Sequence, residues 1–448
     1  MGLGRGRRGA LAAAAVVVLA GACANAGTQA SHAGNTDGVF ADRVVVGGLA
    51  SQSGPLPADF APVLTGAQVY IDMVNAQGGV AGRRIDFAYK LDDQSSPSVD
   101  ATQARTLVEQ DHVFAVVAVA TPSFSGASYL AAHDVPTFGL NVNPNSAWLA
   151  GPSLYGNTGS YTNFTAPQLQ TAYLAEQHHV RAAAILSYNV AQAQQGCIGV
   201  RNAFARYGIP LVFSDMAVPA PAADLHADVT RMKLAGVDMV VSCMDLGGNL
   251  LLANTMEQAG LTGVTQEWFD GYDENAVRVH ASAMEGVYFL LQHVPFEVST
   301  LYPGRYPGMD RFLAMLQRYA PGTVPSEAAL AGWTSADLFV TGLRAVGRDL
   351  TRTRLVAALN RLSAYTADGI EPPIDWRVGH EVASGTMSCT AFVQVQHGAF
   401  VPVYGTPPSV FSCFPLPGPP GPPLEPIVPL PPGVPPLVPA TATGGSGP

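Results

Sequence analysis

Hydroxyl side chains gather in one short stretch of the sequence, Thr121-Pro122-Ser123-Phe124-Ser125. The stretch follows an apolar run typical of a strand and precedes a segment with helical spacing, so it is predicted to open a helix. Hydroxyls beside the free N–H groups of a helix N-terminus bind anions such as carboxylates. A single hydroxyl there could equally be only the helix N-cap. The stretch as a whole therefore predicts a carboxylate site, with Thr121 and Ser123 as its contacts.

Other polar residues follow the other predicted strands. In open parallel α/β sheets, ligands bind outside the carboxyl ends of the strands, so these loops are expected to face one cleft. The candidate ligand contacts chosen in this way are Ser53, Gly54, Asn141, Val142, Asn143, Asp245, Asp270 and Tyr272. Asp270 or Asp273 could pair with a ligand ammonium group, although Asp273 fits a turn or a helix N-cap equally well.

The elements that must position these residues alternate between strand and helix. Val44 to Val46 is a β-branched run that predicts a buried strand, and the small, polar run Gly47 to Pro55 predicts a loop with N–H groups available to a ligand. Thr65 to Asn75 has helical spacing, and Gly78-Gly79 ends that helix because glycine adopts the left-handed conformation without a Cβ clash. Ile85 to Leu91 predicts a second strand. This βαβ unit indicates a parallel sheet and an α/β fold.

The same alternation continues along the chain. Further strands are predicted at 113–119, 135–140, 182–187, 210–214, 239–243, 266–269 and 285–291. Helices are predicted at 100–110, 124–133, 167–178, 194–207, 225–235, 249–259, 306–319, 326–346 and 353–362, the last with Thr351 as its N-cap. Residues 151–159 are predicted as a loop that leaves a first lobe, and residues 291–296 and 369–375 as later crossings. A hairpin is predicted at 390–404, around His397-Gly398.

One block of the sequence resembles a known family. The string Asn75-Ala-Gln-Gly78-Gly79-Val-Ala-Gly82-Arg-Arg-Ile85 is similar to the N-x-x-G-G-I-x-G-x-x-I block of periplasmic branched-chain amino acid (Leu/Ile/Val) binding proteins. These are type I periplasmic binding proteins of ABC transporters, and the order of elements matches theirs through about Tyr404. The resemblance implies an α/β fold with two Rossmann-like lobes joined by a three-strand hinge. The N-terminal lobe would comprise 39–160 and 292–368, and the C-terminal lobe 161–291 and 369–414.

The resemblance also implies roles for single residues. Ser53-Gly54-Pro55 falls on the first ligand-binding turn of the family, and Asp92-Asp93 on the acidic pair that ends its second strand. Thr121 falls on the serine that holds the ligand carboxylate. Val142 and Asn143 fall on an alanine and a threonine of the family's site.

The match weakens at the rest of the amino-acid pocket. Gln192 stands near the position of the family's second-lobe tyrosine, and Asp59, followed by Phe60, stands at the position of its first-lobe aromatic residue. The ammonium-binding glutamate would fall within Asp270 to Asp273, where no glutamate occurs. The ligand expected is therefore an amino acid, an amide, a small organic acid or an aromatic compound.

The N-terminal end has the features of a targeting segment. Residues 1–22 combine three arginines with a short apolar run, which predicts a signal peptide. Leu19-Ala20-Gly21-Ala22-Cys23 resembles a bacterial lipobox, so Cys23 is the expected lipid attachment site and 23–38 a flexible tether. The alternative is a plain secretory signal cleaved near Ala24 or Ala26. The predicted location is the outer face of the cell membrane.

The C-terminal end and the cysteines agree with export. Residues 415–448 are dominated by proline and glycine and are predicted to be a disordered tail. Four cysteines remain after Cys23, and their positions near predicted strand ends favour the pairs Cys197–Cys243 and Cys389–Cys413. Their spacing is not that of a zinc site. No metal and no cofactor is expected.

Charge narrows the classes of partner. The formal net charge is −10, and removal of the three signal-peptide arginines gives −13, because −10 − 3 = −13. An acidic chain without clusters of lysine or arginine argues against nucleic acid as a partner. The expected partners are a small-molecule ligand and an ABC permease in the membrane, and the protein is expected to be a monomer.

These observations predict an extracytoplasmic substrate-binding protein that captures a small polar solute by lobe closure and delivers it to a permease. A ligand-sensing receptor domain of the same fold is the alternative, because the same fold serves both functions. An extracellular enzyme is a more remote alternative. The sequence has no G-x-S-x-G, HExxH or P-loop motif, and a disulfide accounts for Cys197 better than a catalytic thiol does. No catalytic residue is expected.

Overall fold

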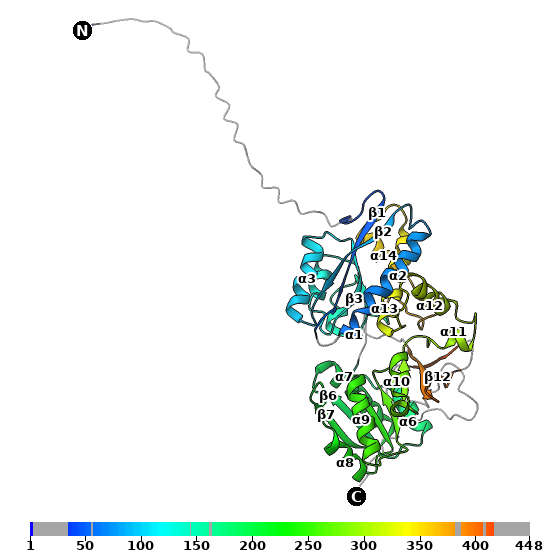
Figure 1. The fold of residues 1–448 in the computed structure, drawn as a ribbon. Coiled ribbons are helices and arrows are strands. Elements are labelled where there is room, and N and C mark those ends of the chain that lie inside the picture. The colour runs from blue at the N-terminus through cyan, green and yellow to red at the C-terminus, as the bar shows by residue number, and fades with distance from the viewer. Residues whose placement is uncertain are drawn as a thin grey trace.

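Two β-sheets form the centres of two lobes in the computed structural model, which describes residues 1–2, 35–54, 57–143, 145–160, 164–380, 387–405 and 409–415 (Figure 1). The first sheet is parallel, with strand order β2-β1-β3-β4-β5. Its strands are β1 (Arg43–Ala50), β2 (Arg84–Asp92), β3 (Ala115–Ala120), β4 (Thr137–Gly139) and β5 (Leu154–Gly156).

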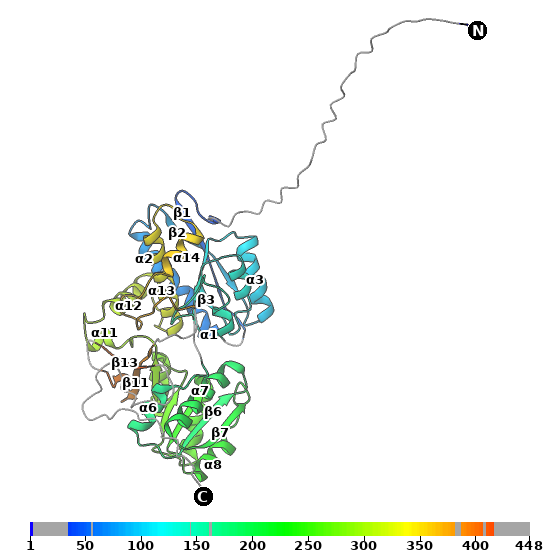
Figure 2. The ribbon, with the colours of Figure 1, turned by 180° about the vertical axis from the view of Figure 1, so that it is seen from behind.

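The second sheet has the order β12-β11-β10-β9-β8-β6-β7, and β13 pairs with β11. Its parallel strands are β6 (Ala183–Tyr188), β7 (Leu211–Val218), β8 (Met239–Cys243), β9 (Thr265–Trp268) and β10 (Tyr288–Leu291). Its antiparallel strands are β11 (Met387–Gln396), β12 (Ala399–Val403) and β13 (Phe411–Pro415). Seen from both sides, β11 to β13 occupy the side of the second lobe nearest α11 (Val298–Leu301) (Figure 2).

Helices cover both sheets. Those of the first lobe are α1 (Pro57–Phe60), α2 (Pro62–Ala76), α3 (Pro97–Glu109), α4 (Ala127–Ala132), α5 (Asn145–Trp148), α12 (Pro307–Tyr319), α13 (Glu327–Val346) and α14 (Arg352–Leu359). Those of the second lobe are α6 (Leu169–Gln177), α7 (Ala191–Tyr207), α8 (His226–Leu234), α9 (Leu246–Gln258) and α10 (Glu274–Met284). The predicted α/β fold with two lobes is confirmed.

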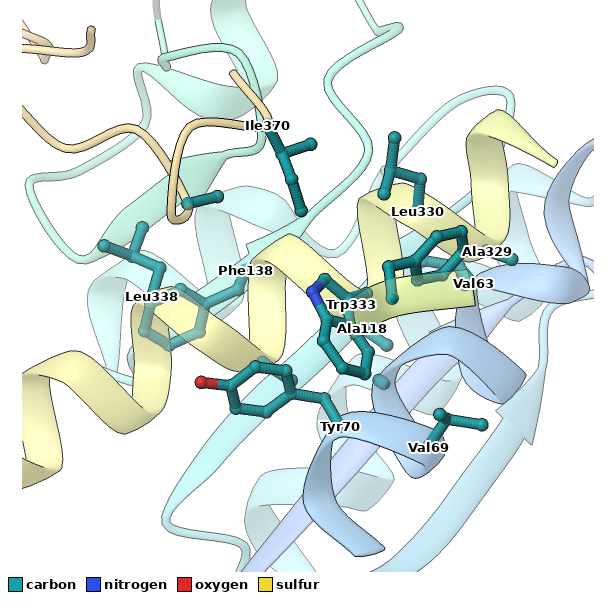
Figure 3. Packing of buried hydrophobic residues seen from close by; sticks show 14 of the residues in the cluster. Val63, Val69, Tyr70, Ala118, Phe138, Ala329, Leu330, Trp333, Leu338 and Ile370 are labelled. Carbon is teal, nitrogen blue, oxygen red and sulfur yellow. The ribbon is translucent and has the colours of Figure 1, made fainter. Parts of the chain in front are cut away.

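The core of the first lobe is built where α2 crosses α13 (Figure 3). Trp333 on α13 packs edge-on against Tyr70 on α2, with 4.7 Å between ring centroids. Glycines allow the two helices to touch, because a Cβ on Gly66 would lie 1.7 Å from the Ala329 carbonyl oxygen. A Cβ on Gly332 would likewise lie 1.9 Å from the Val63 carbonyl oxygen. Helix α2 is therefore held in place by α13, which lies more than 250 residues later in the chain.

Several local predictions are confirmed. The βαβ unit forms as β1, α2 and β2, and both Gly78 and Gly79 have positive φ after the helix, at 98° and 76°. Thr351 caps α14 by accepting a hydrogen bond from the Arg354 backbone N–H. The hairpin of β11 and β12 turns at His397-Gly398, where both residues have positive φ, as a type I′ turn requires. Both predicted disulfides form.

Three element predictions are wrong. Residues 154–156, expected in a loop, form β5 at the edge of the first sheet, because their backbone pairs with β4. Gly47 to Ala50, expected in the first ligand-binding loop, lie inside β1 and pair with both β2 and β3. Sequence periodicity also missed β13, which is held beside β11 by the Cys389–Cys413 pair.

The predicted crossings between the lobes lie side by side, since the Val294 backbone N–H donates to the Ile370 carbonyl oxygen (2.8 Å). Trp376 packs against Tyr155 of the first lobe at 5.0 Å between ring centroids. The predicted lobe boundaries and the three-strand hinge stay predictions. The signal peptide, Cys23, the tether as far as residue 34 and the tail from residue 416 lie outside the described residues. Within the described ranges, no helix is long and apolar enough to cross a membrane.

Candidate ligand-binding site

The loop after β1 is bound to the end of β2 by Asp92. The Asp92 carboxylate accepts hydrogen bonds from the Ser53 hydroxyl (2.6 Å) and from the backbone N–H groups of Gln52 (2.9 Å) and Ser53 (3.2 Å). Slight burial raises the pKa of Asp92, but these bonds and one from Gln94 hold it below its ordinary value. Gly54 has φ +95°, and a Cβ there would lie 2.5 Å from the Gln94 carbonyl oxygen. The donors predicted to face a ligand at Ser53 are therefore used inside the protein.

The hydroxyl loop after β3 contains an internal carboxylate that the sequence did not predict. Asp100 on α3 accepts a hydrogen bond from the Gly126 backbone N–H (2.6 Å), at the position where α4 begins. Burial raises the pKa of Asp100 to about 7, although hydrogen bonds from Gly126, Thr121 and Ser125 oppose the rise. The chain's own carboxyl group thus occupies part of the predicted anion site. Asp100 lies on the buried face of α3 with Ala104 and Leu107, and nothing in the local sequence marks a carboxyl group at that position for this role.

The hydroxyl groups of Thr121 and Ser123 differ in whether they already have a hydrogen-bond partner within the protein. Thr121 is fully buried, and its hydroxyl accepts a hydrogen bond from the Ser123 backbone N–H (3.3 Å). The Ser123 hydroxyl is buried without a hydrogen-bond partner among the described residues. Ser123 is consequently the better placed of the two to donate to a ligand carboxylate, and this role remains a prediction.

The asparagines after β4 hold the chain together at the end of the first sheet. Asn143 is fully buried, donates to the Thr121 carbonyl oxygen (2.6 Å) and accepts from the Trp148 indole N–H (3.2 Å). The Asn141 backbone N–H donates to the Asn157 side-chain oxygen (2.9 Å). Val142 is half-buried and packs at the edge of the core. These contacts give Asn141 and Asn143 structural roles in the loop.

In the second lobe, the structure brings Asp245 and Asp270 together at the carboxyl ends of the neighbouring strands β8 and β9. Asp245 caps α9, accepting hydrogen bonds from the Gly248 backbone N–H (2.8 Å) and the Tyr188 hydroxyl (2.7 Å). Asp270 accepts from the backbone N–H groups of Leu246 (3.1 Å) and Gly271 (2.8 Å). The strand-end rule therefore placed this pair correctly, while the sequence gave no sign of the Tyr188 contact.

Carboxyl groups of the first lobe face this pair. Burial raises the pKa of Asp270 to about 7, and the negative charges of Asp59 and Glu327 raise it further. The pKa of Asp59 on α1 is also raised. Burial is the larger cause, and the negative charge of Asp245 is the second. Within the described part of the chain, no lysine or arginine forms an ion pair with Asp59, Asp245 or Asp270. Glu327 has a partner of its own in His293, whose Nε2 lies 3.1 Å from its carboxylate, so the repulsion between the lobes acts mainly between Asp59 and the pair Asp245 and Asp270, and a ligand cation would relieve it.

Two large apolar residues are exposed after strands of the second sheet. Phe269 directly precedes Asp270 and is 42 % exposed, and Val190, between β6 and α7, is 46 % exposed. Gln192 stands half-buried in the first turn of α7. Large exposed apolar residues at strand ends can contact the nonpolar part of a ligand.

Tyr272 is placed in the crossing between the lobes, apart from the acidic pair. It is 5 % exposed, and its ring stacks on Phe296 with 5.3 Å between centroids. Its hydroxyl donates to Glu297 (2.6 Å) and accepts from the Phe296 backbone N–H (2.9 Å). Its described contacts are therefore those of a residue that packs the crossing segment. Asp273 is the N-cap of α10, accepting from the Ala276 backbone N–H (2.7 Å).

A parallel sheet in one lobe and a mixed sheet in the other define the architecture, and residues 43–399 match the sequence model of the periplasmic binding protein family. The chain belongs to the periplasmic binding protein family. Members of this family work outside the cytoplasm as binding proteins. None of the curated proteins matches the sequence.

Solved structures share the fold of this periplasmic binding protein. The fatty acid ABC transporter substrate-binding protein from Thermomonospora curvata has a TM-score of 0.66 and 15 % identity, over 82 % of this chain and 93 % of that one. The branched-chain amino acid binding protein LivJ from Streptococcus pneumoniae, in complex with isoleucine, has a TM-score of 0.64 and 18 % identity, over 81 % and 99 %. A solute-binding protein from R. palustris in complex with benzoate has a TM-score of 0.62 and 18 % identity, over 81 % and 95 %.

Proposed function

We propose that this protein is the substrate-binding component of an ABC importer and that its solute carries an ammonium group and a nonpolar part, as an aliphatic amino acid does. It captures the solute between its lobes outside the membrane and presents the closed form to a permease. The observation that carries the proposal is the set of carboxyl groups that both lobes turn toward each other, Asp59 and Glu327 on one side and Asp245 and Asp270 on the other.

Electrostatics links this arrangement to ligand-driven closure. Without a ligand, closure brings the carboxylates of the two lobes closer, and their repulsion opposes it. An ammonium group placed between them converts the repulsion into attraction. Such a solute therefore binds the closed form better than the open form, and this difference in affinity is what shifts the population.

The ligands of the neighbours help to choose among solute classes. The titles of the three proteins name a fatty acid, isoleucine and benzoate. Each of these ligands carries a carboxylate, and isoleucine alone adds an ammonium group. A ligand with only a carboxylate would bring a further negative group to the carboxyl groups of Asp245 and Asp270, whereas the exposed apolar side chains of Phe269 and Val190 suit an aliphatic group.

Calorimetry with matched ligands tests the proposal. L-isoleucine, L-leucine, 4-methylpentanoate and 3-methylbutylamine separate the contributions of the two charged groups. We expect the two amino acids to bind and the acid without an amine not to bind. At a ligand concentration a hundredfold above Kd, the protein should gain about 2.7 kcal/mol in unfolding free energy. Binding of the carboxylic acid alone would contradict the proposed class of solute.

A pair of variants tests the role of Asp270. Asp270→Asn keeps the shape of the side chain and removes its charge, so we expect solute affinity to fall about 10- to 100-fold, in line with the strength of hydrogen bonds to charged groups. Asp273→Asn is the matched control, because Asn caps α10 as well as Asp does. Equal affinities for the two variants would show that Asp270 does not contact the solute.

A further inference from the structure

A second cavity lies at the opposite end of the first lobe from the acidic pair. It has a volume of about 740 Å³ and is lined by Thr36, Val39 to Ala41, Arg83, Arg348 to Thr351, Thr353 and Arg354. These residues include the segment through which the chain enters β1, at the end of the lobe that points away from the second lobe (Figures 1 and 2). The volume falls in the range of small-ligand sites.

The charge of the cavity is opposite to that of the protein. Arg83, Arg348 and Arg354 line it, with Asp349 as the one acidic residue among its lining residues in the described part of the chain. The whole chain has 23 basic and 33 acidic residues, so a local excess of two positive charges is not a general property of its surface. Three guanidinium groups around one cavity form a site that attracts anions.

Backbone contacts hold two of the arginines in place. Arg83 donates from Nε to the Phe40 carbonyl oxygen (2.7 Å) and from Nη1 to the Arg348 carbonyl oxygen (3.1 Å). Arg354 donates from Nη1 to the Asp349 carbonyl oxygen (3.0 Å), and the same nitrogen forms an ion pair with the Asp349 carboxylate (3.4 Å), so its remaining N–H groups are the ones available to an anion. The exposed Arg348 side chain makes no hydrogen bond to any described residue. Positioned guanidinium groups with N–H groups to spare lose less freedom when they bind an oxyanion.

The start of α14 adds to the positive potential. Arg352 is the first residue of this helix, and Thr351 and Arg354 of the cavity lining flank it. The backbone N–H groups of Arg352 and Arg354 already donate to the Asn35 carbonyl oxygen (3.0 Å) and the Thr351 hydroxyl (3.2 Å), so the helix adds only the positive potential of its N-terminal end to that of the three guanidinium groups.

We propose that this cavity binds a phosphate group. Guanidinium groups match phosphate oxygens with paired hydrogen bonds, so three of them favour phosphate over a simple monovalent anion. The phosphate could belong to the headgroup of an anionic lipid or be free in solution. A lipid headgroup is the favoured source, because Thr36 and Val39 to Ala41 line the cavity and precede β1 on the side of the chain that leads back to the predicted anchor at Cys23. Phosphate recognition itself does not depend on the solute proposed for the acidic site.

Two binding measurements on the mature full chain separate the sources. Calorimetry with inorganic phosphate tests the free anion. Co-sedimentation with vesicles of 30 % phosphatidylglycerol in phosphatidylcholine, against pure phosphatidylcholine, tests the headgroup; the protein for this arm carries Cys23→Ser, so that no anchor contributes. Phosphate binding in either arm supports the site, and the arm that responds identifies the source. Absence of binding in both arms overturns the proposal.

Arg348→Ala is the informative variant, because its side chain has no partner to lose and folding should be unaffected. We expect at least a fivefold loss of phosphate or vesicle affinity. The control is Arg201→Ala, at an exposed position on α7 of the second lobe. It removes the same charge far from the cavity and should change neither phosphate affinity nor vesicle affinity. Equal losses in the two variants would indicate a general charge effect and refute the site. Solute affinity, measured in parallel, should stay unchanged in Arg348→Ala, so failure of this proposal is distinct from failure of the importer function.

Discussion

Glu267 is a carboxyl group enclosed in the second lobe, where it is 1 % exposed and accepts one hydrogen bond from the Thr171 hydroxyl (2.8 Å). Burial raises its pKa to about 8. The folded state therefore binds a proton that the unfolded state releases above about pH 4.3. Stability is greatest below that pH and falls as pH rises toward 8, by at most about 1.4 kcal/mol per pH unit from this group.

Glu267→Gln should remove the part of the pH dependence that comes from Glu267, because glutamine keeps the contact with Thr171 and has no proton to lose; Asp100, Asp270 and Glu371 keep their own contributions. We expect the variant to unfold at higher denaturant concentration than the wild type at pH 8 and at a similar concentration at pH 5. Urea unfolding at both pH values measures the effect. Glu257→Gln, at an exposed position on α9, is the control. A Glu267→Gln variant that differs from the wild type by the same amount at pH 5 and at pH 8 would argue against a raised pKa for Glu267 in the fold.

At the scale of elements, the contact between α2 and α13 decides whether the first lobe forms. Gly66→Ala would place a methyl group 1.7 Å from the Ala329 carbonyl oxygen, so the helices must separate. We expect a loss of at least about 1–3 kcal/mol in unfolding free energy. Gly247→Ala on α9 has open space around the new Cβ, with the nearest atom at 3.5 Å, and should be neutral or stabilise by up to about 1 kcal/mol. Thermal unfolding compares the two; a tolerated Gly66→Ala would mean that the helices pack less closely.

At the scale of the whole molecule, the facing carboxyl groups should control lobe closure. Asp59→Asn removes one of the charges that oppose closure, so the ligand-free protein should become more compact in small-angle X-ray scattering. Solute binding should compact the wild type further than this variant. Asp42→Asn, exposed at the entry to β1, changes the net charge equally and should have no effect on compactness. An unchanged scattering profile for Asp59→Asn would mean that repulsion between the lobes does not oppose closure.

The location of the molecule depends on its proposed anchor. Cys23→Ser should move the protein from the membrane fraction to the soluble extracytoplasmic fraction, because the acylated thiol is lost. Fractionation and immunoblotting measure the ratio. Retention of the variant at the membrane would place the anchor elsewhere in the chain.

The sequence by itself determined features that depend on neighbouring residues. The βαβ unit, the glycine stop at Gly78-Gly79, the cap at Thr351 and the hairpin turn at His397-Gly398 all follow from local conformational preference. Both cysteine pairs were also predicted, because Cys197 lies near the start of a predicted helix that precedes the strand ending at Cys243, and Cys389 and Cys413 both lie near the C-terminal crossing. Strand ends likewise predicted that Asp245 and Asp270 would meet.

Tertiary structure alone decided the remaining features. The short strand β5 exists because β4 offers it a partner, and three residues carry no periodicity of their own. Asp100 fills part of the predicted anion site because α3 packs against the start of α4. The charges of Asp59, Asp270 and Glu327 affect one another because folding brings together segments about 57 to 268 residues apart. Such long-range electrostatics has no local signature in a sequence, since it arises only when two lobes are placed face to face.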